Sequence, residues 1–429
     1  MNVVAGKKLL LLAGSANMVD LVKRAKELGI YTIVTDYNDK YDSPAKRVAD
    51  EVWDISWTDI DKLENACRNA KVDGVIAGYS EFTVENQIML CERLGLPCYC
   101  TKEQLKITRN KDFFKKECIA NKVPVVHEYE SPTLIEKFPV IVKPVDRGGS
   151  IGISIANNKK ELDKAVKYAM DMSVCKKIVI EDFIFDGIKI DIYYGIVDGK
   201  ITLLSTSDTI NAKGNVSSGG FSKVIQNGWL CPSKYHNQII SQLDKSLSRM
   251  IYNMGIKNGF IAFSGFAIEK DDLVSFVIFE AGFRLTGDHL YSYFKSIGFI
   301  DIQDIFIYHA LLGDKKKIDI GEINKTNLKA AVVNYYADEG ILTCVEGFDM
   351  ISNLEDFNFM VNIGRLGHQC TKDNAILYKI AMFHFCNNSP DKLASDIDYS
   401  NKAFIAYNEN GQDMVFERME SEMVKNWWK

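Results

Sequence analysis

A glycine-rich turn after an apolar strand is the segment whose residue types are best suited to chemistry. The strand ends at Lys143, and residues 144–152 then place Gly148, Gly149 and Ser150 at a hairpin tip before a second strand begins. Glycines leave backbone N–H groups unobstructed, so such a tip can approach phosphate oxygens. The tip lacks the GxxxxGK(S/T) pattern and precedes a strand rather than a helix, which excludes a P-loop. Lys143 follows three apolar residues, so its ammonium must either meet an anion or reach solvent.

Two further strand ends carry polar residues. The first apolar strand runs into Glu181, Asp182, Phe183 and Ile184, where freed backbone groups can read the edge of an adenine ring. At the second strand end, Glu280 and Arg284 lie four residues apart. A carboxylate suits Mg²⁺, and the planar fork of an arginine suits a phosphate or a carboxylate. An ordinary ion pair between Glu280 and Arg284 is the alternative interpretation.

The elements that must position these residues follow from hydrophobic patterning. In the first hundred residues, apolar strands alternate with amphipathic helices, which predicts a doubly wound parallel sheet. The strands are expected at 8–13, 30–35, 51–54 and 74–77, and the helices at 18–28, 59–70 and 81–94. The middle of the chain predicts helices at 110–122, 159–170 and 233–254, a hairpin at 188–207, strands at 260–268 and 274–280, and a mobile loop at 208–228. The rest predicts a small α+β unit.

Composition bounds the class of protein. The chain has 429 residues, of which 47% are hydrophobic and 25% charged, as expected of a globular protein with several domains. Its net charge of −5 offers no basic excess for a polyphosphate surface, so we expect no nucleic-acid partner. The ten cysteines lack paired CxxC spacing and indicate reduced thiols. The first residues contain no signal segment and no membrane span, so we expect a cytoplasmic protein without a membrane partner.

Taken in order, these motifs resemble the ATP-grasp superfamily, specifically its carboxylate–amine ligases of the biotin-carboxylase-like and amino-acid-ligase-like architecture. The resemblance implies three domains of mixed α/β and α+β class. A pre-ATP-grasp α/β domain would span 1–105, a two-lobed ATP-grasp domain 106–314 with a lid lobe at about 115–185, and a small β-rich domain 315–429.

The resemblance also implies roles for individual residues. ATP would be bound by the helix-start lysine Lys111, the strand lysine Lys143, the lid residues Arg147, Gly148, Gly149 and Ser150, and the hinge Glu181, Asp182, Phe183 and Ile184. Glu280 would hold Mg²⁺, and Arg284 and Lys143 would act in catalysis, with Arg284 orienting an acyl phosphate.

The sequence departs from the family pattern at three places. Lys189 stands where the family has a glutamate for the ribose hydroxyls, and we hypothesise that Asp191, on the same strand face, takes that role, paired with Lys189. Gly282 replaces an asparagine that would bind Mg²⁺, and residues 263–265 contain no carboxylate. Asp288 could substitute as a metal ligand, although a loop cap is the simpler interpretation.

The function implied is ATP-dependent joining of a carboxylate to an amine through an acyl phosphate, with release of ADP and phosphate. The polar composition of 208–228 favours a small polar metabolite such as an amino acid as substrate, and a homodimer is possible. Two alternatives stay open, namely a bicarbonate-activating enzyme of the carboxylase or purine-pathway type and a non-catalytic ATP-binding module. The histidines His289 and His309 are interpreted as packed residues rather than bases.

Overall fold

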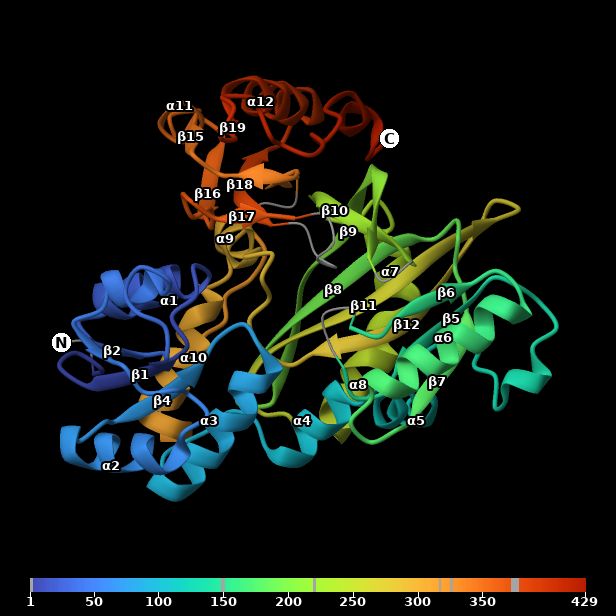
Figure 1. Cartoon of the computed structure of the whole chain (residues 1–429). Coiled ribbons are helices and arrows are strands. Elements are labelled where there is room, and N and C mark those ends of the chain that lie inside the picture. The colour runs from blue at the N-terminus through green and yellow to red at the C-terminus, as the bar shows by residue number, and fades with distance from the viewer. Residues whose placement is uncertain (1–2, 148–150, 219–220, 316–317, 325–326, 372–377) are drawn as a thin grey trace.

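The computed structural model describes residues 3–147, 151–218, 221–315, 318–324, 327–371 and 378–429. Figure 1 shows an N-terminal sheet with its helices, a group of long strands in the middle, a lobe beside those strands and a C-terminal unit above them. The glycine-rich tip at Gly148, Gly149 and Ser150 lies outside the described residues.

The N-terminal sheet is parallel, as predicted. Strands β1 (Lys8–Leu12), β2 (Tyr31–Thr35), β3 (Glu51–Trp53) and β4 (Gly74–Ala77) lie in the order β3-β2-β1-β4. The four leucines of β1 are fully buried, as expected of a strand in a parallel sheet with both faces covered. Its helices are α1 (Met18–Glu27), α2 (Ile60–Ala70) and α3 (Glu81–Leu94), followed by α4 (Lys102–Arg109).

A large antiparallel sheet connects the middle and the end of the chain. Its order is β12-β11-β8-β9-β10-β13-β18-β16. The strands are β8 (Ile188–Val197), β9 (Lys200–Ser218), β10 (Phe221–Cys231), β11 (Gly259–Lys270), β12 (Leu273–Gly282), β13 (Lys329–Tyr336), β16 (Phe357–Asn362) and β18 (Lys379–Asn387). The join between β10 and β13 requires a glycine, because a Cβ at Gly228 would lie 1.9 Å from the Val332 carbonyl oxygen. The sheet thus continues across residue 314, where a domain boundary is expected.

The prediction of a mobile loop at 208–228 is wrong for the described part of that segment. Residues 208–218 and 221–228 extend β9 and β10, which pair with each other in antiparallel register. The pairing is irregular near Gln226, and the tail of the chain compensates on β9. The Glu417 carboxylate accepts hydrogen bonds from the backbone N–H groups of Lys213 and Gly214, at 2.7 and 2.9 Å. Long-range pairing here prevails over a composition that is typical of loops.

A small lobe carries the predicted glycine-rich hairpin. Strand β5 (Val140–Pro144) pairs antiparallel with β6 (Ser154–Ala156) and β7 (Ile178–Asp182), and α6 (Lys159–Met172) covers the sheet. The lobe has a hydrophobic core of its own, made of Val140, Val142, Ala156, Leu162, Ala165, Ala169 and Ile180. In Figure 1 it lies beside the long strands rather than within their sheet.

The remaining elements are short. They are α5 (Lys111–Ala120), α7 (His236–Ile239), a π-helical turn at 240–244, α8 (Lys245–Asn253), α9 (Tyr291–Ser296), α10 (Ile302–Leu312), β14 (Gly340–Ile341), β15 (Cys344–Glu346), α11 (Phe348–Ser352), β17 (Gln369–Cys370), α12 (Pro390–Ala403) and β19 (Ile405–Tyr407). At the end of the chain, the indole N–H groups of Trp427 and Trp428 donate to Asp208 Oδ2 and the Pro232 carbonyl, at 2.8 and 2.7 Å. Among the described residues, no helix combines the length and the apolar character needed to cross a membrane.

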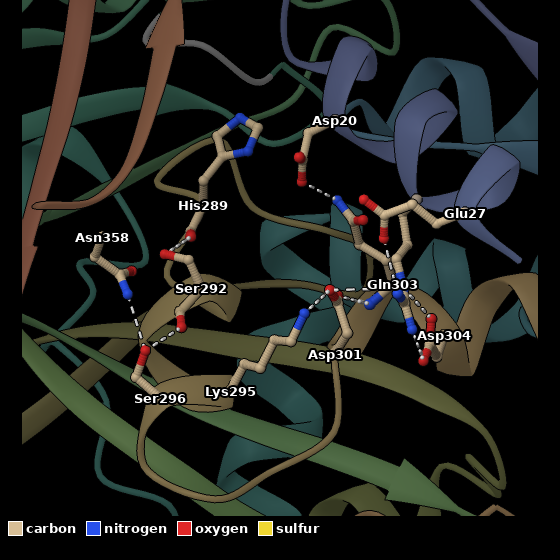
Figure 2. A network of polar contacts seen from close by, with 11 residues as sticks. Asp20, Glu27, His289, Ser292, Lys295, Ser296, Asp301, Gln303, Asp304 and Asn358 are labelled. Carbon is tan, nitrogen blue, oxygen red and sulfur yellow. Dashed lines mark hydrogen bonds and ion pairs between the residues drawn. The ribbon is translucent and has the colours of Figure 1, made fainter. Parts of the chain in front are cut away.

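Polar contacts fasten the three regions to one another (Figure 2). Gln303 of α10 donates to Asp20 of α1 at 2.8 Å, and Arg24 of α1 pairs with Asp304 of α10 at 2.8 Å. On the other side, Asn358 of β16 donates to Ser296 of α9 at 2.8 Å. Helices α9 and α10 therefore bridge the N-terminal sheet and the C-terminal strands.

Candidate active site

A cleft of about 690 Å³ is lined by residues of all three regions. Six of the predicted site residues line it, namely Lys111, Arg147, Lys189, Asp191, Glu280 and Arg284. Lys143 and the predicted hinge at 181–184 are not in that lining.

Lys111 is the first residue of α5. The side chain of Asn110 caps this helix by accepting from the N–H groups of Asp112 and Phe113. Lys111 therefore places its charge at the positive end of the helix dipole. Burial lowers the pKa of its amine, the charge of Glu280 opposes that shift, and its Nζ donates to the Arg147 carbonyl at 2.7 Å. An anionic ligand in front of this helix end would favour the charged form of the Lys111 amine.

Lys143 is held inside the protein by an acid. Its side chain is 11% exposed, and its Nζ lies 2.8 Å from Glu181 Oε2, while Lys115 Nζ lies 2.6 Å from Glu181 Oε1. Burial opposes ionisation of Glu181, but the charges of Lys143 and Lys115 prevail and lower its pKa. Lys143 therefore does not reach solvent along an edge strand, and its anion in this structure is Glu181.

Two backbone N–H groups of the predicted hinge at 181–184 already form hydrogen bonds within the protein. The N–H groups of Asp182 and Phe183 donate to the carbonyls of His127 and Pro139, at 3.1 and 3.2 Å. A void of about 10 Å³ lies beside Glu181, between Lys111 and Phe279. That is about the space one water molecule needs.

Three side chains form a row across neighbouring strands. Asp191 on β8, Ser264 on β11 and Glu280 on β12 are aligned in register and all line the cleft. The Ser264 hydroxyl donates to Asp191 Oδ1, and Lys189 Nζ lies 3.6 Å from Asp191 Oδ2. Glu280 is exposed in the cleft and, within the described ranges, its carboxylate accepts no hydrogen bond and forms no ion pair.

Arg284 does not pair with Glu280. Its Nε donates to Glu81 Oε1 of α3 at 2.7 Å, and its Nη1 donates to the Leu285 carbonyl at 2.9 Å. The N-terminal region thus orients the guanidinium, and the alternative of a simple Glu280–Arg284 ion pair is wrong.

Asp288 and the two histidines have structural partners. The Asp288 carboxylate accepts from Thr286 Oγ1, the Leu290 N–H and the Tyr193 hydroxyl, at 2.7, 3.1 and 3.1 Å. Burial raises its pKa, as expected for a buried loop cap. His289 is fully buried and hydrogen-bonded to Tyr291 and Asn17, and His309 lies 3.8 Å from Asp314. Burial lowers the pKa of both histidines, which confirms their interpretation as packed residues.

Comparison with known proteins shows what this chain is similar to. Residues 102–251 match the family model of the D-ala D-ala ligase C-terminus. The chain has the ATP-grasp fold. A D-alanine–D-alanine ligase of Fusobacterium nucleatum is 27% identical over 169 residues, which cover 39% of this chain and 54% of that protein. The chain therefore spans about half the length of the curated relatives it matches.

Two solved ATP-grasp structures extend the likeness of fold to nearly the whole chain. The L-amino acid ligase from Bacillus licheniformis superposes with a TM-score of 0.74 at 17% identity, covering 95% of this chain and 100% of that one. The biotin carboxylase domain of the 2-oxoglutarate carboxylase of Hydrogenobacter thermophilus, a complex with MgADP, ADP and bicarbonate, superposes with a TM-score of 0.76 at 15% identity, covering 94% and 91%.

The acids of this cleft fit a Mg²⁺ ion that would enter together with a phosphate ligand. Within the described residues, no group of three or more histidine, cysteine or acidic side chains could hold a metal ion. Among the described acids that line the cleft, Glu280 alone offers an uncommitted carboxylate, because Glu81, Asp191 and Asp288 are engaged as described above. Mg²⁺ commonly keeps waters and leans on phosphate oxygens, so one protein carboxylate is a sufficient donor set for it.

Glu81 and Lys379 are charged residues of the cleft that were not proposed from sequence. Glu81 lies 203 positions from its partner Arg284, and its place at the start of a helix gives no sign of that pairing. Lys379 comes from the C-terminal unit and lines the cleft beside Trp229. Conversely, Asn211 and Lys213 of the 208–228 segment, whose polar composition favoured a small polar substrate, line a separate pocket of about 160 Å³ next to the tail.

Proposed function

We propose that the chain is an ATP-dependent ligase that joins a carboxylate to an amine, with a small polar metabolite such as an amino acid as substrate. The supporting observation is the convergence of Lys111, Glu280 and Arg284 in one cleft. A cation at a helix start, an uncommitted acid and an oriented guanidinium are the groups that transfer of a phosphoryl group to a carboxylate requires.

The chemistry follows from the weakness of a carboxylate as an electrophile. Transfer of the γ-phosphoryl group of ATP to a carboxylate oxygen gives an acyl phosphate and ADP, and attack by the amine then expels phosphate. Lys111, Lys143 and Arg147 neutralise charge on the phosphates. Glu280 would hold Mg²⁺, which when bound neutralises charge between the transferred and leaving phosphates. Arg284, fixed by Glu81, stabilises the oxyanion that develops when the amine attacks.

The nucleotide requires movement of the lobe. We place the adenine at the 181–184 hinge and the ribose near Lys189 and Asp191. The void at Glu181 has room for about one water, so the lobe must separate from β12 for the base to enter. The separate core of the lobe allows it to move as one body, and closure excludes water from the acyl phosphate.

Turnover with a substrate panel tests the proposal. The purified chain is incubated with MgATP and pooled L-amino acids, and ADP and phosphate are measured together with the product by mass spectrometry. We expect release that needs both a carboxylate and an amine, and loss of that release in Glu280→Gln. ATP binding without turnover on any substrate would instead support the non-catalytic module.

A bicarbonate-activating enzyme is the second candidate. It is favoured by the superposition with a biotin carboxylase domain whose complex contains bicarbonate. The same assay separates the two proposals, because phosphate release that depends on bicarbonate and not on an amino acid would support this candidate.

A further inference from the structure

Lys379 brings a cation from the C-terminal unit into the cleft. It is the first residue of β18 and lies opposite Tyr336 of β13. Its Nζ lies 5.5 Å from the ring centroid of Trp229 and 5.5 Å from that of Tyr336. Both Lys379 and Trp229 line the 690 Å³ cleft. Two aromatic faces thus hold the ammonium at the cleft wall.

Among the residues that the structure describes, this ammonium has no anion of its own. In the described residues, which omit 372–377 just before it, Lys379 forms no hydrogen bond and no ion pair. Burial lowers its pKa to about 8, and the charge of Asp288 opposes that shift. The Asp288 oxygens already accept from Thr286, Leu290 and Tyr193. A desolvated lysine without a partner is unfavourable unless a ligand provides the negative charge.

Lys379 enters the cleft from a different region of the chain than Lys111. Lys379 begins β18 of the C-terminal unit, whereas Lys111 begins α5. Glu280 is the acid that acts most on Lys111, whereas Asp288 is the acid that acts on Lys379. The two cations can therefore bind different anionic groups.

We propose that Lys379 binds a carboxylate of the amino-acid substrate, with the Trp229 ring as the adjoining wall. The proposal rests on the proposed function, whose substrate class it specifies. A monoanion suits the position better than a phosphate ester, because Lys379 offers a single point charge and the acid Asp288 acts on the same ammonium. A dianion there would meet one cation beside an acid.

Thermal shift measurements test the assignment without requiring turnover. Wild-type protein, Lys379→Met, Lys379→Arg and the control Lys329→Met are each saturated with MgADP. Each is then titrated with single L-amino acids, acetate, succinate and inorganic phosphate. Lys329 is a matched control. It lies on β13, the strand next to β18, and its Nζ lies 5.7 Å from the Trp428 ring, but it does not line the cleft.

We expect at least one carboxylate to stabilise wild-type and Lys329→Met protein, and its affinity to fall about tenfold or more in Lys379→Met. Lys379→Arg should keep the effect in part, which guards against a folding defect in the methionine variant. A shift that persists in Lys379→Met, a response to inorganic phosphate alone, or no response to any carboxylate would each overturn the proposal. A Lys379-dependent shift without ADP release would retain this site while refuting the ligase function.

The pH profile gives a second readout. Lys379 is charged below its pKa, so carboxylate affinity should be full below about pH 8 and fall about tenfold per unit above it. Its neighbours His289 and His384 have pKa values lowered by burial and stay neutral in this range, and Asp288 is the acid that faces it. Because arginine stays charged, the profile should flatten in Lys379→Arg. An unchanged profile in that variant would assign the titration to another group.

Discussion

Replacement of Glu280 by glutamine should separate activity from stability. The Glu280 carboxylate is exposed in the cleft and has no hydrogen bond or ion pair to another described residue, so no fold contact is lost. We expect the free energy of unfolding to change by less than about 0.5 kcal/mol. Loss of one preorganised group that stabilises transferring charge costs about 3–4 kcal/mol, so kcat should fall by about 10² to 10³.

The assay pairs ADP release at saturating MgATP with urea unfolding of the same preparations. Asp272→Asn is the matched control. Asp272 lies in the turn of the same β11–β12 hairpin and outside the cleft, and its substitution removes the same negative charge as Glu280→Gln. The control should keep wild-type kcat. A Glu280→Gln protein with kcat within fivefold of wild type would refute the assignment of Glu280 to the reacting phosphates, and a loss of several kcal/mol of stability would show that its role is structural.

Three further predictions concern residues in the cleft and in the neighbouring lobe. Glu181→Gln leaves the buried Lys143 without its counter-ion and should lower the free energy of unfolding by about 3 kcal/mol in urea titrations. The double variant Glu181→Gln, Lys143→Met should recover part of that loss. Additive losses of stability from the two substitutions would contradict a coupled pair. Asp191→Ala should raise the KM for ATP about tenfold if Asp191 holds the ribose, and an unchanged KM in the coupled ADP assay rules that role out. Gly282→Asn fits sterically, because an added Cβ would meet no atom closer than 3.7 Å. It should lower the Mg²⁺ concentration for half-maximal activity several-fold. An unchanged Mg²⁺ titration would place position 282 outside the metal site.

Local patterning was sufficient to predict most elements of the fold. The leucine run of β1 and the Asp198-Gly199 turn between β8 and β9 are determined by residues close in sequence, and both were predicted correctly. The same holds for Lys111, whose place at a helix start follows from the asparagine before it. These are features in which neighbouring residues provide the periodicity, the cap or the turn.

Features that depend on distant partners were not predictable in this way. The 208–228 segment has a loop-like composition, yet its described residues pair as β9 and β10, and the distant Glu417 accepts hydrogen bonds from two N–H groups of β9. The partner of Arg284 likewise comes from α3 in the N-terminal region. No spacing in the sequence encodes these contacts, because they arise when separate regions pack against one another.

The charges of the described cleft residues are consistent with the proposed binding of a triphosphate by an acidic protein with one free acid in that lining. The protein carries a net charge of −5, but six basic and four acidic side chains line the cleft. Three of these acids are engaged, Glu81 by Arg284, Asp191 by Ser264 and Lys189, and Asp288 by its own loop and Tyr193. Their role is to position cations and loops rather than to bind metal. In the proposed function, the cations in excess would attract the phosphates, and the phosphates in turn would provide most of the oxygen ligands that Mg²⁺ needs. A cleft of this kind should therefore bind the metal weakly alone and well only as MgATP.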